Sequence, residues 1–353
     1  MAEAALERVF ARHRAFWSRE PVEKPILSVE RYEPLDAVEM RLADGSPVRE
    51  DMYLSPDLLD PRLMLELEET PRPPRGEPDR PGGVSGDVLI VRRPMSKMCW
   101  VEAVMGCPVR VRAASGSIYS EPYLDSPAEL WRIPSTEDNP WLELLQDYTR
   151  TLAEHAQGRY HVSQCLMRGT IDLVAAVLGY DRMCAAFYDH PREVHKLNEL
   201  CVEVFLKVAE AQYAVIPRLA GGYATYFEIW APGSVIRSQC DASAATSAKM
   251  YEEFFFPYEE EIFKRFDYSI VHLHSGFLHT VPTFLKTDYP TSIQVSLDTG
   301  STPETPHTLI PTFKRILEKK PLFIQGPLTK AELDELLREL PATGLYIGGH
   351  LMD

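Results

Sequence analysis

The second half of the chain alternates between strand-like and helix-like hydrophobic patterns. Short apolar runs predict strands over 159–164, 221–227, 269–274, 291–297, 321–325 and 344–349. Apolar positions at helical spacing separate most of these runs, as over 170–178, 191–215, 243–266, 308–319 and 330–340. Together with two or three earlier strands, this alternation predicts an α/β fold, a (β/α)8 TIM-type barrel. An open doubly wound sheet is the alternative, although no glycine-rich nucleotide motif follows any predicted strand.

The first part of the chain is less regular. Residues 2–18 have the pattern of an amphipathic helix, and 24–32 that of a strand, whereas the Pro- and Gly-rich stretch 70–83 predicts an irregular loop. We interpret residues 1–95 as an N-terminal extension with this Pro/Gly-rich loop, belonging to the same domain as a barrel over 96–353. No helix follows the last predicted strand, so its apolar outer face needs a cover. We expect the helix 2–18 to pack beside that strand or to form a homodimer contact there.

Two histidines stand at the end of the strand predicted over 269–274. Successive side chains of a strand alternate in direction, so His272 and His274 share one face, about 6–7 Å apart along the strand. In a barrel that face is the interior, at the C-terminal end where barrel enzymes place their chemistry. Two imidazoles so placed can bind one metal ion. Two hydrogen-bonded polar residues at a strand end are the alternative.

Charge and composition narrow the class of protein. The 353 residues carry a formal net charge of −15, which argues against nucleic acid or an anionic membrane as the partner. There is no basic, apolar leader and no run of about 20 apolar residues. The six cysteines form no C-x-x-C pair and suit a reducing compartment. A cytoplasmic enzyme acting on a small molecule is therefore expected.

Further polar residues stand at or near the ends of the predicted strands. Glu228 and Asp241 are candidates for acid–base catalysis. The alternative for Glu228 is a rim ion pair with an arginine such as Arg237, and that for Asp241 is a helix cap. Arg168 can bind a substrate carboxylate or phosphate, or form a surface ion pair. The remaining candidates for substrate binding are His279, Gln294 and Tyr346.

Five phrases in the sequence resemble the uroporphyrinogen decarboxylase superfamily in their order and spacing. They are Trp100-Val-Glu-Ala-Val-Met-Gly-Cys-Pro, Gly169-Thr-Ile-Asp-Leu-Val-Ala-Ala-Val-Leu-Gly, Phe187-Tyr-Asp-His-Pro-Arg-Glu-Val-His, Cys240-Asp-Ala-Ser and Tyr251-Glu-Glu-Phe-Phe-Phe-Pro-Tyr. The resemblance extends over roughly residues 95–353 and implies a (β/α)8 barrel. One branch of the superfamily decarboxylates uroporphyrinogen and carries an arginine-rich Arg-Gln-Ala-Gly-Arg phrase, which this chain lacks.

The other branch transfers methyl groups between a corrinoid protein and a thiol, with zinc bound by a His-x-Cys strand and a later Cys. At these places this chain has His272-Leu-His274 and Gly348-Gly-His350. The resemblance thus implies a divalent metal, zinc first, on His272, His274 and His350, a set with an open fourth position. It implies a metal-dependent enzyme similar to the methyltransferases, with a corrinoid protein as a partner. A porphyrinogen-type decarboxylase and a non-catalytic barrel that binds a ligand or a corrinoid protein are the alternatives.

Overall fold

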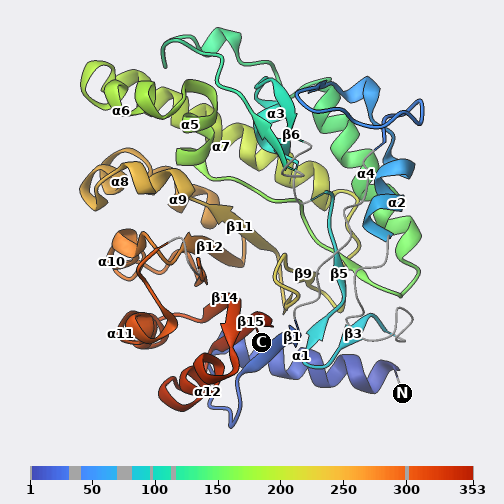
Figure 1. Cartoon of the computed structure of the whole chain (residues 1–353), viewed down its shortest axis with the longest axis vertical. Helices are drawn as coiled ribbons and strands as arrows, with labels where there is room; N and C mark the ends of the chain where they lie inside the picture. Colours follow the sequence, from blue (N-terminus) through green and yellow to red (C-terminus); the bar gives the residue numbers. More distant parts are fainter. Residues whose placement is uncertain are drawn as a thin grey trace.

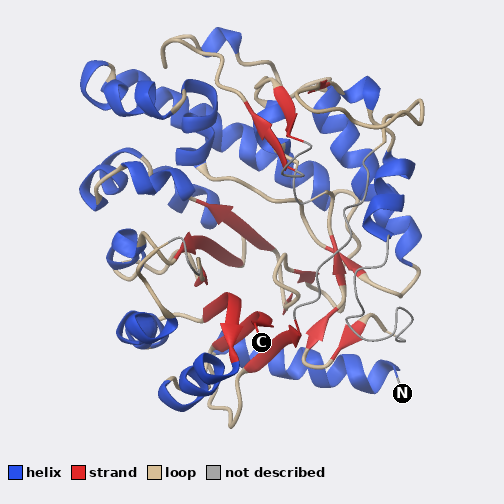
Figure 2. Cartoon of the chain, in the orientation of Figure 1, coloured by secondary structure: helices blue, strands red, loops and turns tan. Residues whose placement is uncertain are grey.

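A computed structural model of the chain describes residues 2–31, 41–69, 82–95, 98–112, 117–298 and 302–352. Strands occupy the centre of the molecule and most of the helices lie around them (Figure 1, Figure 2). Six strands form one parallel sheet in the order β1-β15-β14-β13-β12-β11, and β5 pairs in parallel with β8. The predicted α/β fold with a parallel sheet is confirmed, and the arrangement of strands and helices fits a TIM-type barrel.

The parallel strands are β1 (Ile26–Arg31), β5 (Val91–Arg92), β8 (His161–Val162), β11 (Val235–Gln239), β12 (Tyr268–His274), β13 (Ser292–Ser296), β14 (Leu322–Thr329) and β15 (Leu345–Met352). Short antiparallel pieces accompany them: β2 (Tyr53–Leu54), β6 (Val109–Arg112) and β7 (Ser117–Ser120) in one sheet, the pair β3 (Val84–Ser85) and β4 (Val88–Leu89), and the pair β9 (Tyr223–Ala224) and β10 (Trp230–Ala231).

The helices of the described residues are α1 (Ala2–Ser18), α2 (Pro61–Glu69), α3 (Trp100–Val104), α4 (Pro140–Ala156), α5 (Thr170–Leu178), α6 (Tyr180–Asp189), α7 (Pro191–Tyr213), α8 (Ala248–Phe254), α9 (Phe256–Phe263), α10 (Val281–Phe284), α11 (Pro306–Leu317) and α12 (Lys330–Glu339). Side chains fix several helix starts: Thr305 and Thr329 form capping boxes for α11 and α12, and Asn139 caps α4. None of the described helices combines the length and the apolar character needed to cross a bilayer.

One of the strands predicted in the second half is not part of the parallel sheet. Residues 221–227 do not enter the parallel sheet, because β9 turns back on β10 as an antiparallel hairpin. The place in the sheet belongs to β11, which the hydrophobic pattern does not reveal. All five residues of β11 are buried, yet Arg237 and Gln239 interrupt its apolar character. The other predicted strands correspond to β8 and β12 to β15. The predicted loop 70–83 lies outside the described residues up to position 81.

The predicted N-terminal helix is present as α1, and it covers the edge at which the strands begin. The Phe16 ring lies 4.8 Å from that of Phe323, near the start of β14, and the Trp17 ring lies 4.8 Å from that of Tyr268, the first residue of β12. Phe16 and the side chain of Arg19 also approach Gly344, just before β15. The helix therefore reaches the last strand at its N-terminal end, and its aromatic residues close the bottom of the sheet.

His13 attaches α1 to the turn between β3 and β4 and to the first residue of β10. Its imidazole is fully buried, with Nε2–H donating to the carbonyl of Asp87 (2.9 Å) and Nδ1 accepting from the backbone N–H of Trp230 (2.9 Å). Both bonds require the neutral ring, since a second ring proton would face the Trp230 N–H. Burial lowers the pKa of His13 to about 4, although the hydrogen bond to Asp87 opposes that shift.

We expect His13 to make the fold sensitive to acid. Its pKa is lower in the folded chain than the ordinary 6.5. The contribution of neutral His13 to the free energy of unfolding is therefore complete above pH 6.5. It is lost as the pH falls toward 4, and the loss is about 3 kcal/mol. The measurement is the free energy of unfolding at pH 7.5 and pH 4.5 for the native chain and His13→Gln. The difference between the two proteins should shrink at the lower pH, and a difference that does not change with pH would contradict the prediction.

Candidate metal site

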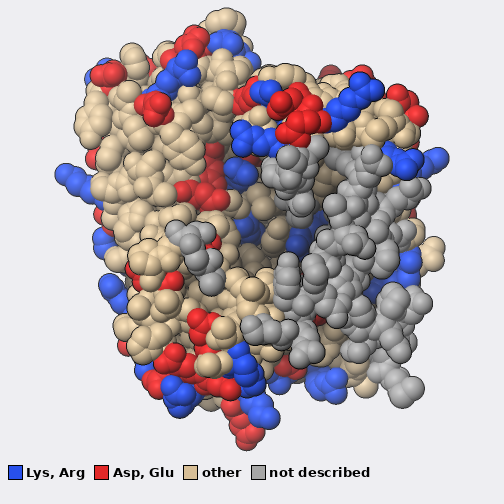
Figure 3. Space-filling model, viewed as in Figure 1, with Lys and Arg blue, Asp and Glu red and all other residues tan. Residues whose placement is uncertain are grey.

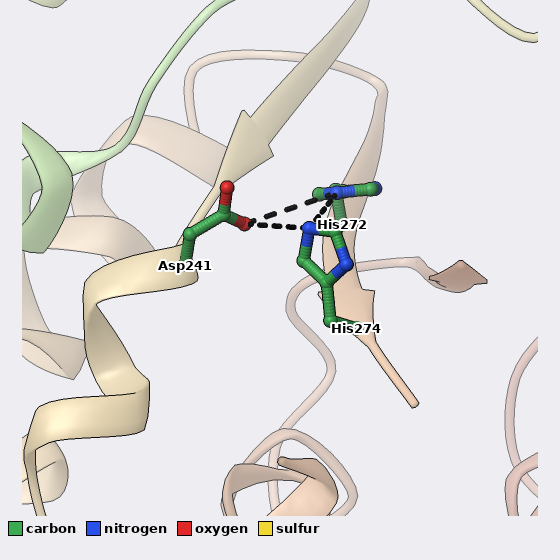
Figure 4. A group of neighbouring side chains, drawn as sticks. All are labelled: Asp241, His272 and His274. Carbon is green, nitrogen blue, oxygen red and sulfur yellow. Dashed lines mark hydrogen bonds and ion pairs between the residues drawn. The ribbon is translucent and has the colours of Figure 1, made fainter. Parts of the chain in front are cut away.

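The two histidines predicted from the sequence face a carboxylate at the C-terminal rim of the sheet. His272 and His274 end β12, and Asp241 begins the short 3-10 helix η4 (Asp241–Ala245) two residues after β11. Because β11 and β12 run in parallel and pair with Gln239 opposite His272, their ends bring these side chains to the same place. Figure 4 shows the carboxylate and both rings pointing toward one another.

The distances among the three groups suit a small divalent ion. Nε2 of His272 lies 3.3 Å from Nε2 of His274, and Oδ1 of Asp241 lies 3.8 Å and 3.4 Å from these nitrogens. A tetrahedral zinc ion with bonds of about 2.0–2.1 Å holds its ligand atoms about 3.3 Å apart. Among the described residues, these three side chains are the group of His, Cys, Asp or Glu whose ligand atoms lie within 4.8 Å of one another.

Neighbouring side chains orient both rings. Nδ1 of His272 contacts Oε1 of Gln294 on β13, and Nδ1 of His274 lies 2.8 Å from Oδ1 of Asp298, just beyond β13. Both partners are acceptors, so each Nδ1 carries a proton, and Nε2 is the atom of each ring that faces Asp241. Asp298 is itself held by Ser275, whose Oγ accepts its backbone N–H at 3.0 Å. Two imidazole nitrogens and one carboxylate oxygen thus converge on one point, which a proton on Nε2 of His274 or a metal cation can occupy.

Comparison with known proteins shows the family to which the chain belongs. The family model described as uroporphyrinogen decarboxylase (URO-D) matches residues 93–326. The chain belongs to the uroporphyrinogen decarboxylase family. A methyltransferase from Methanosarcina mazei has a similar structure, with a TM-score of 0.58 and 14% identity, covering 98% of this chain and 93% of the other. That likeness concerns the fold. No curated protein matches the sequence.

Their surroundings shift the pKa values of Asp241, His272 and His274 in different ways. Burial, with the charge of Arg237 as a further cause, lowers the pKa of His272 to about 3. The hydrogen bond to Asp241 and the one to Asp298 raise the pKa of His274 to about 9, against the effect of burial. Burial alone would raise the pKa of Asp241, but His274, His272 and Arg237 outweigh it and lower that pKa. The site therefore combines an ionised carboxylate with one strongly basic and one weakly basic imidazole.

A second carboxyl group lies behind Asp241. Asp172, in the first turn of α5, is buried and accepts the backbone N–H of Ala242 at 2.7 Å. Burial and then the charge of Asp241 raise its pKa well above the usual range, so Asp172 keeps its proton while Asp241 is ionised. Arg168 precedes α5 and forms an ion pair of 2.9 Å with the buried Glu102. The charge of Glu102 raises the pKa of Arg168 further, with smaller contributions from Asp172 and Asp241.

The other predicted site residues have different surroundings. His350 lies on β15, which β14 and β13 separate from β12 in the sheet. It is in register with Pro327 and Glu30, and it is not one of the three grouped ligands. Its place as a ligand stays a prediction. The side chain of Tyr346 fills the space beside Gly348, since a Cβ there would lie 2.6 Å from the Tyr346 hydroxyl. Tyr346 itself is fully buried, with its ring 5.4 Å from that of Phe323.

Glu228, predicted at a strand end, lies instead in the turn of the β9–β10 hairpin. It is buried, has a φ of +66°, and accepts a hydrogen bond from Ser28 on β1 at 3.2 Å. Its predicted partner Arg237 hydrogen-bonds to Gln239. His279 lies in η5 (Leu278–Thr280), and its Nε2 is buried with no hydrogen-bond partner among the described residues. The catalytic role of Glu228 and the binding role of His279 remain predictions.

Sequence reasoning overlooked several residues that support the site. Asp298 follows the predicted strand 291–297 directly, at the rim, and that position is a signal that could have identified it. Gln294 contacts His272 through its Oε1, and its predicted role in substrate binding remains a prediction. Gln239 and Arg237 lie on the undetected strand β11, and Gln239 donates a hydrogen bond to Asp241. Asp172 is surrounded by apolar residues of α5, so its sequence context resembles an ordinary buried helix.

Proposed function

We propose that this chain is a metal-dependent enzyme, similar to the methyltransferases of the uroporphyrinogen decarboxylase superfamily, in a closed (β/α)8 barrel. The observation that supports it is the convergence of one ionised carboxylate and two oriented imidazoles at the C-terminal rim. Asp241, His272 and His274 would hold a divalent ion, with zinc as the first choice. His350 would be a further ligand only if β15 and β12 approach each other more closely when the site is loaded.

A divalent ion held by Asp241, His272 and His274 would supply Lewis acidity toward a thiol, hydroxyl or water in this place. The surrounding residues have their own tasks. Gln294 and Asp298 face the Nδ1 atoms and so direct both Nε2 atoms toward the ion, whose binding would displace the proton that His274 carries on Nε2. Asp172, which holds a proton beside Asp241, can donate a hydrogen bond to a substrate oxygen or nitrogen. A corrinoid protein as the partner of this chain is also part of the proposal.

Methyl transfer is favoured over decarboxylation of a porphyrinogen by the chemistry of the site. Several propionates need several arginines, and the Arg-Gln-Ala-Gly-Arg phrase is absent from the sequence. The rim instead offers a set of metal ligands. The set contains no thiolate, so it is harder than a His-Cys-Cys site and a stronger Lewis acid. That donor set suits activation of an oxygen or nitrogen nucleophile as well as a thiol.

Metal analysis of the purified chain tests the proposal. We expect close to one zinc per chain after dialysis against a zinc-containing buffer, and loss of that zinc with a strong chelator. Demethylation of methylcobalamin should depend on the zinc. The reaction is followed by the absorbance of methylcobalamin, with a panel of small thiols and alcohols as methyl acceptors. A chain that binds no divalent metal after reconstitution would overturn the proposal. Conversion of uroporphyrinogen to coproporphyrinogen by the metal-free chain would identify a decarboxylase instead.

A further inference from the structure

Arg237 is a buried cation without a buried anion at hydrogen-bonding distance. The residue is 5% exposed and points from β11 into the interior. Its Nη2 donates to Oε1 of Gln239 at 2.8 Å and its Nη1 to the carbonyl of Met167 at 3.4 Å. Its Nε is buried and has no partner among the described residues. Burial lowers the pKa of Arg237, which shows that the surroundings compensate its charge poorly.

A second arginine lies against the same aromatic ring. Arg93, directly after β5, has its guanidinium carbon 3.9 Å from the ring centroid of Tyr226, and that of Arg237 is 4.9 Å from this centroid. Arg93 donates to the carbonyl of Tyr226 at 3.3 Å, and its Nε is also buried without a hydrogen-bond partner among the described residues. Both guanidinium groups therefore lie against the Tyr226 ring, and each has an Nε–H donor without a hydrogen-bond partner among the described residues.

Comparison with Arg168 shows what this pair lacks. Arg168 is close to the same region and has the carboxylate of Glu102 at 2.9 Å. No carboxylate among the described residues lies within 4 Å of the guanidinium nitrogens of Arg93 or Arg237. Stacking on Tyr226 offsets part of the cost of their charges. Two like charges with unused N–H donors still form a site that an oxyanion would complete.

The two arginines adjoin the candidate metal site. Gln239 accepts from Arg237 and donates to Asp241, so one side chain connects the arginine to the metal ligand. The charge of Arg237 also acts on the pKa of His272. In the space-filling view, this face of the molecule is hollowed between β11 and β5, and basic side chains line the hollow (Figure 3). Tyr226 and Arg237 line a small cavity together with Gln164, Thr225 and Val235.

We propose that Arg93 and Arg237 bind the carboxylate of a small anionic substrate whose reacting atom reaches Asp241, His272 and His274. This inference rests on the proposed function for the reacting end of the substrate. Tyr226 holds the two guanidinium groups apart and in place, and the anion accepts the N–H groups that have no partner. The substrate class is that of short carboxylic acids with a thiol, hydroxyl or amine a few bonds from the carboxylate.

Calorimetric titration of the zinc-loaded chain with 3-mercaptopropanoate and 3-mercaptopropan-1-ol tests the inference, because the two probes differ only in the charged end. We expect the acid to bind at least roughly tenfold more tightly, since it gains charge-assisted bonds that the alcohol lacks. Arg93→Gln and Arg237→Gln should each abolish most of that preference while leaving the affinity for the alcohol unchanged. Arg265→Gln is the matched control, since Arg265 is exposed and forms an ion pair with Glu261 on α9.

The zinc content and melting temperature of each variant are measured alongside. Arg237 is buried and its variant could fold poorly, but Arg93 is partly exposed and gives an independent test. Equal binding of the two probes by the native chain, or a preference that survives in Arg93→Gln, would overturn the anion site even if zinc is bound. A chain that binds no zinc but retains a preference for the acid that depends on Arg93 would instead support the anion site and contradict the proposed metal enzyme. Loss of zinc in Arg237→Gln, with the preference intact in Arg93→Gln, would assign Arg237 to positioning Asp241 and reject the anion site.

Discussion

His274→Ala is expected to reduce the bound metal from one ion per chain to a small fraction of that. The imidazole is one of three donors, and Asp241 with His272 alone would give a two-ligand site. His272 is also the more buried and less basic ring, so it cannot hold an ion well on its own. The measurement is zinc per chain by elemental analysis after passage through a desalting column, together with the rate of methylcobalamin demethylation.

His307→Ala is the matched control for this experiment. His307 is also paired with a carboxylate, at 2.8 Å from Glu335, but it is exposed on α11. Its variant should keep the metal and the activity. Asp298→Asn should weaken the affinity for zinc by about 10–100-fold, the usual effect of removing a group that orients a ligand. Stoichiometric zinc in His274→Ala would reject the assigned site.

The same assay decides the place of His350. If His350→Ala keeps its zinc while His274→Ala loses it, the ligands are those of the β11–β12 rim, and His350 has another role. If both variants lose zinc, β15 contributes a ligand and the predicted three-histidine site gains support. The melting temperature of each variant, measured without metal, separates loss of a ligand from loss of the fold.

The sequence reveals the parts of the site in which local pattern and chemistry coincide. The alternation of Val271, His272, Leu273 and His274 fixes the face of both imidazoles, because strand geometry leaves no other arrangement. Gln294 and Tyr346 likewise belong to inward-facing positions of their strands, as their contacts with His272 and Phe323 show. Their roles could not be inferred, since a side chain's direction does not determine its partner across the sheet.

The third candidate ligand, Asp241, is brought to the site by a contact between separate elements, and no local sequence pattern indicates such a contact. Asp241 resembles a helix cap in the sequence, and only the pairing of β11 with β12 places it opposite the histidines. β11 itself was missed because its inward side chains, Arg237 and Gln239, serve the site. A strand that carries polar functional groups inside a barrel loses the apolar signal by which strands are recognised.

Gly169→Ala is expected to destabilise the fold and the site together. Gly169 precedes α5 with an ordinary φ of −77°, so space alone requires glycine here. A Cβ would lie 2.2 Å from Oε1 of Glu259, 2.4 Å from Oγ of Ser238 and 2.7 Å from the carbonyl of Gln239. Glu259 is fully buried and accepts hydrogen bonds from Thr170 and Ser238, so it cannot move into solvent.

The added methyl group must therefore displace either this buried carboxylate or the end of β11, two residues before Asp241. We expect a loss of more than about 3 kcal/mol in the free energy of unfolding, from overpacking together with broken hydrogen bonds to a buried charge. The affinity for zinc should fall as well, because Gln239 shifts with the strand. Gly158→Ala is the control: it has a φ of +80° but open space around it, so backbone strain should cost only about 1–2 kcal/mol. Urea denaturation and zinc titration of both variants provide the measurements. A Gly169→Ala chain that unfolds no more easily than Gly158→Ala would show that the junction between α5 and β11 is not tightly packed, and that the position of Asp241 does not depend on it.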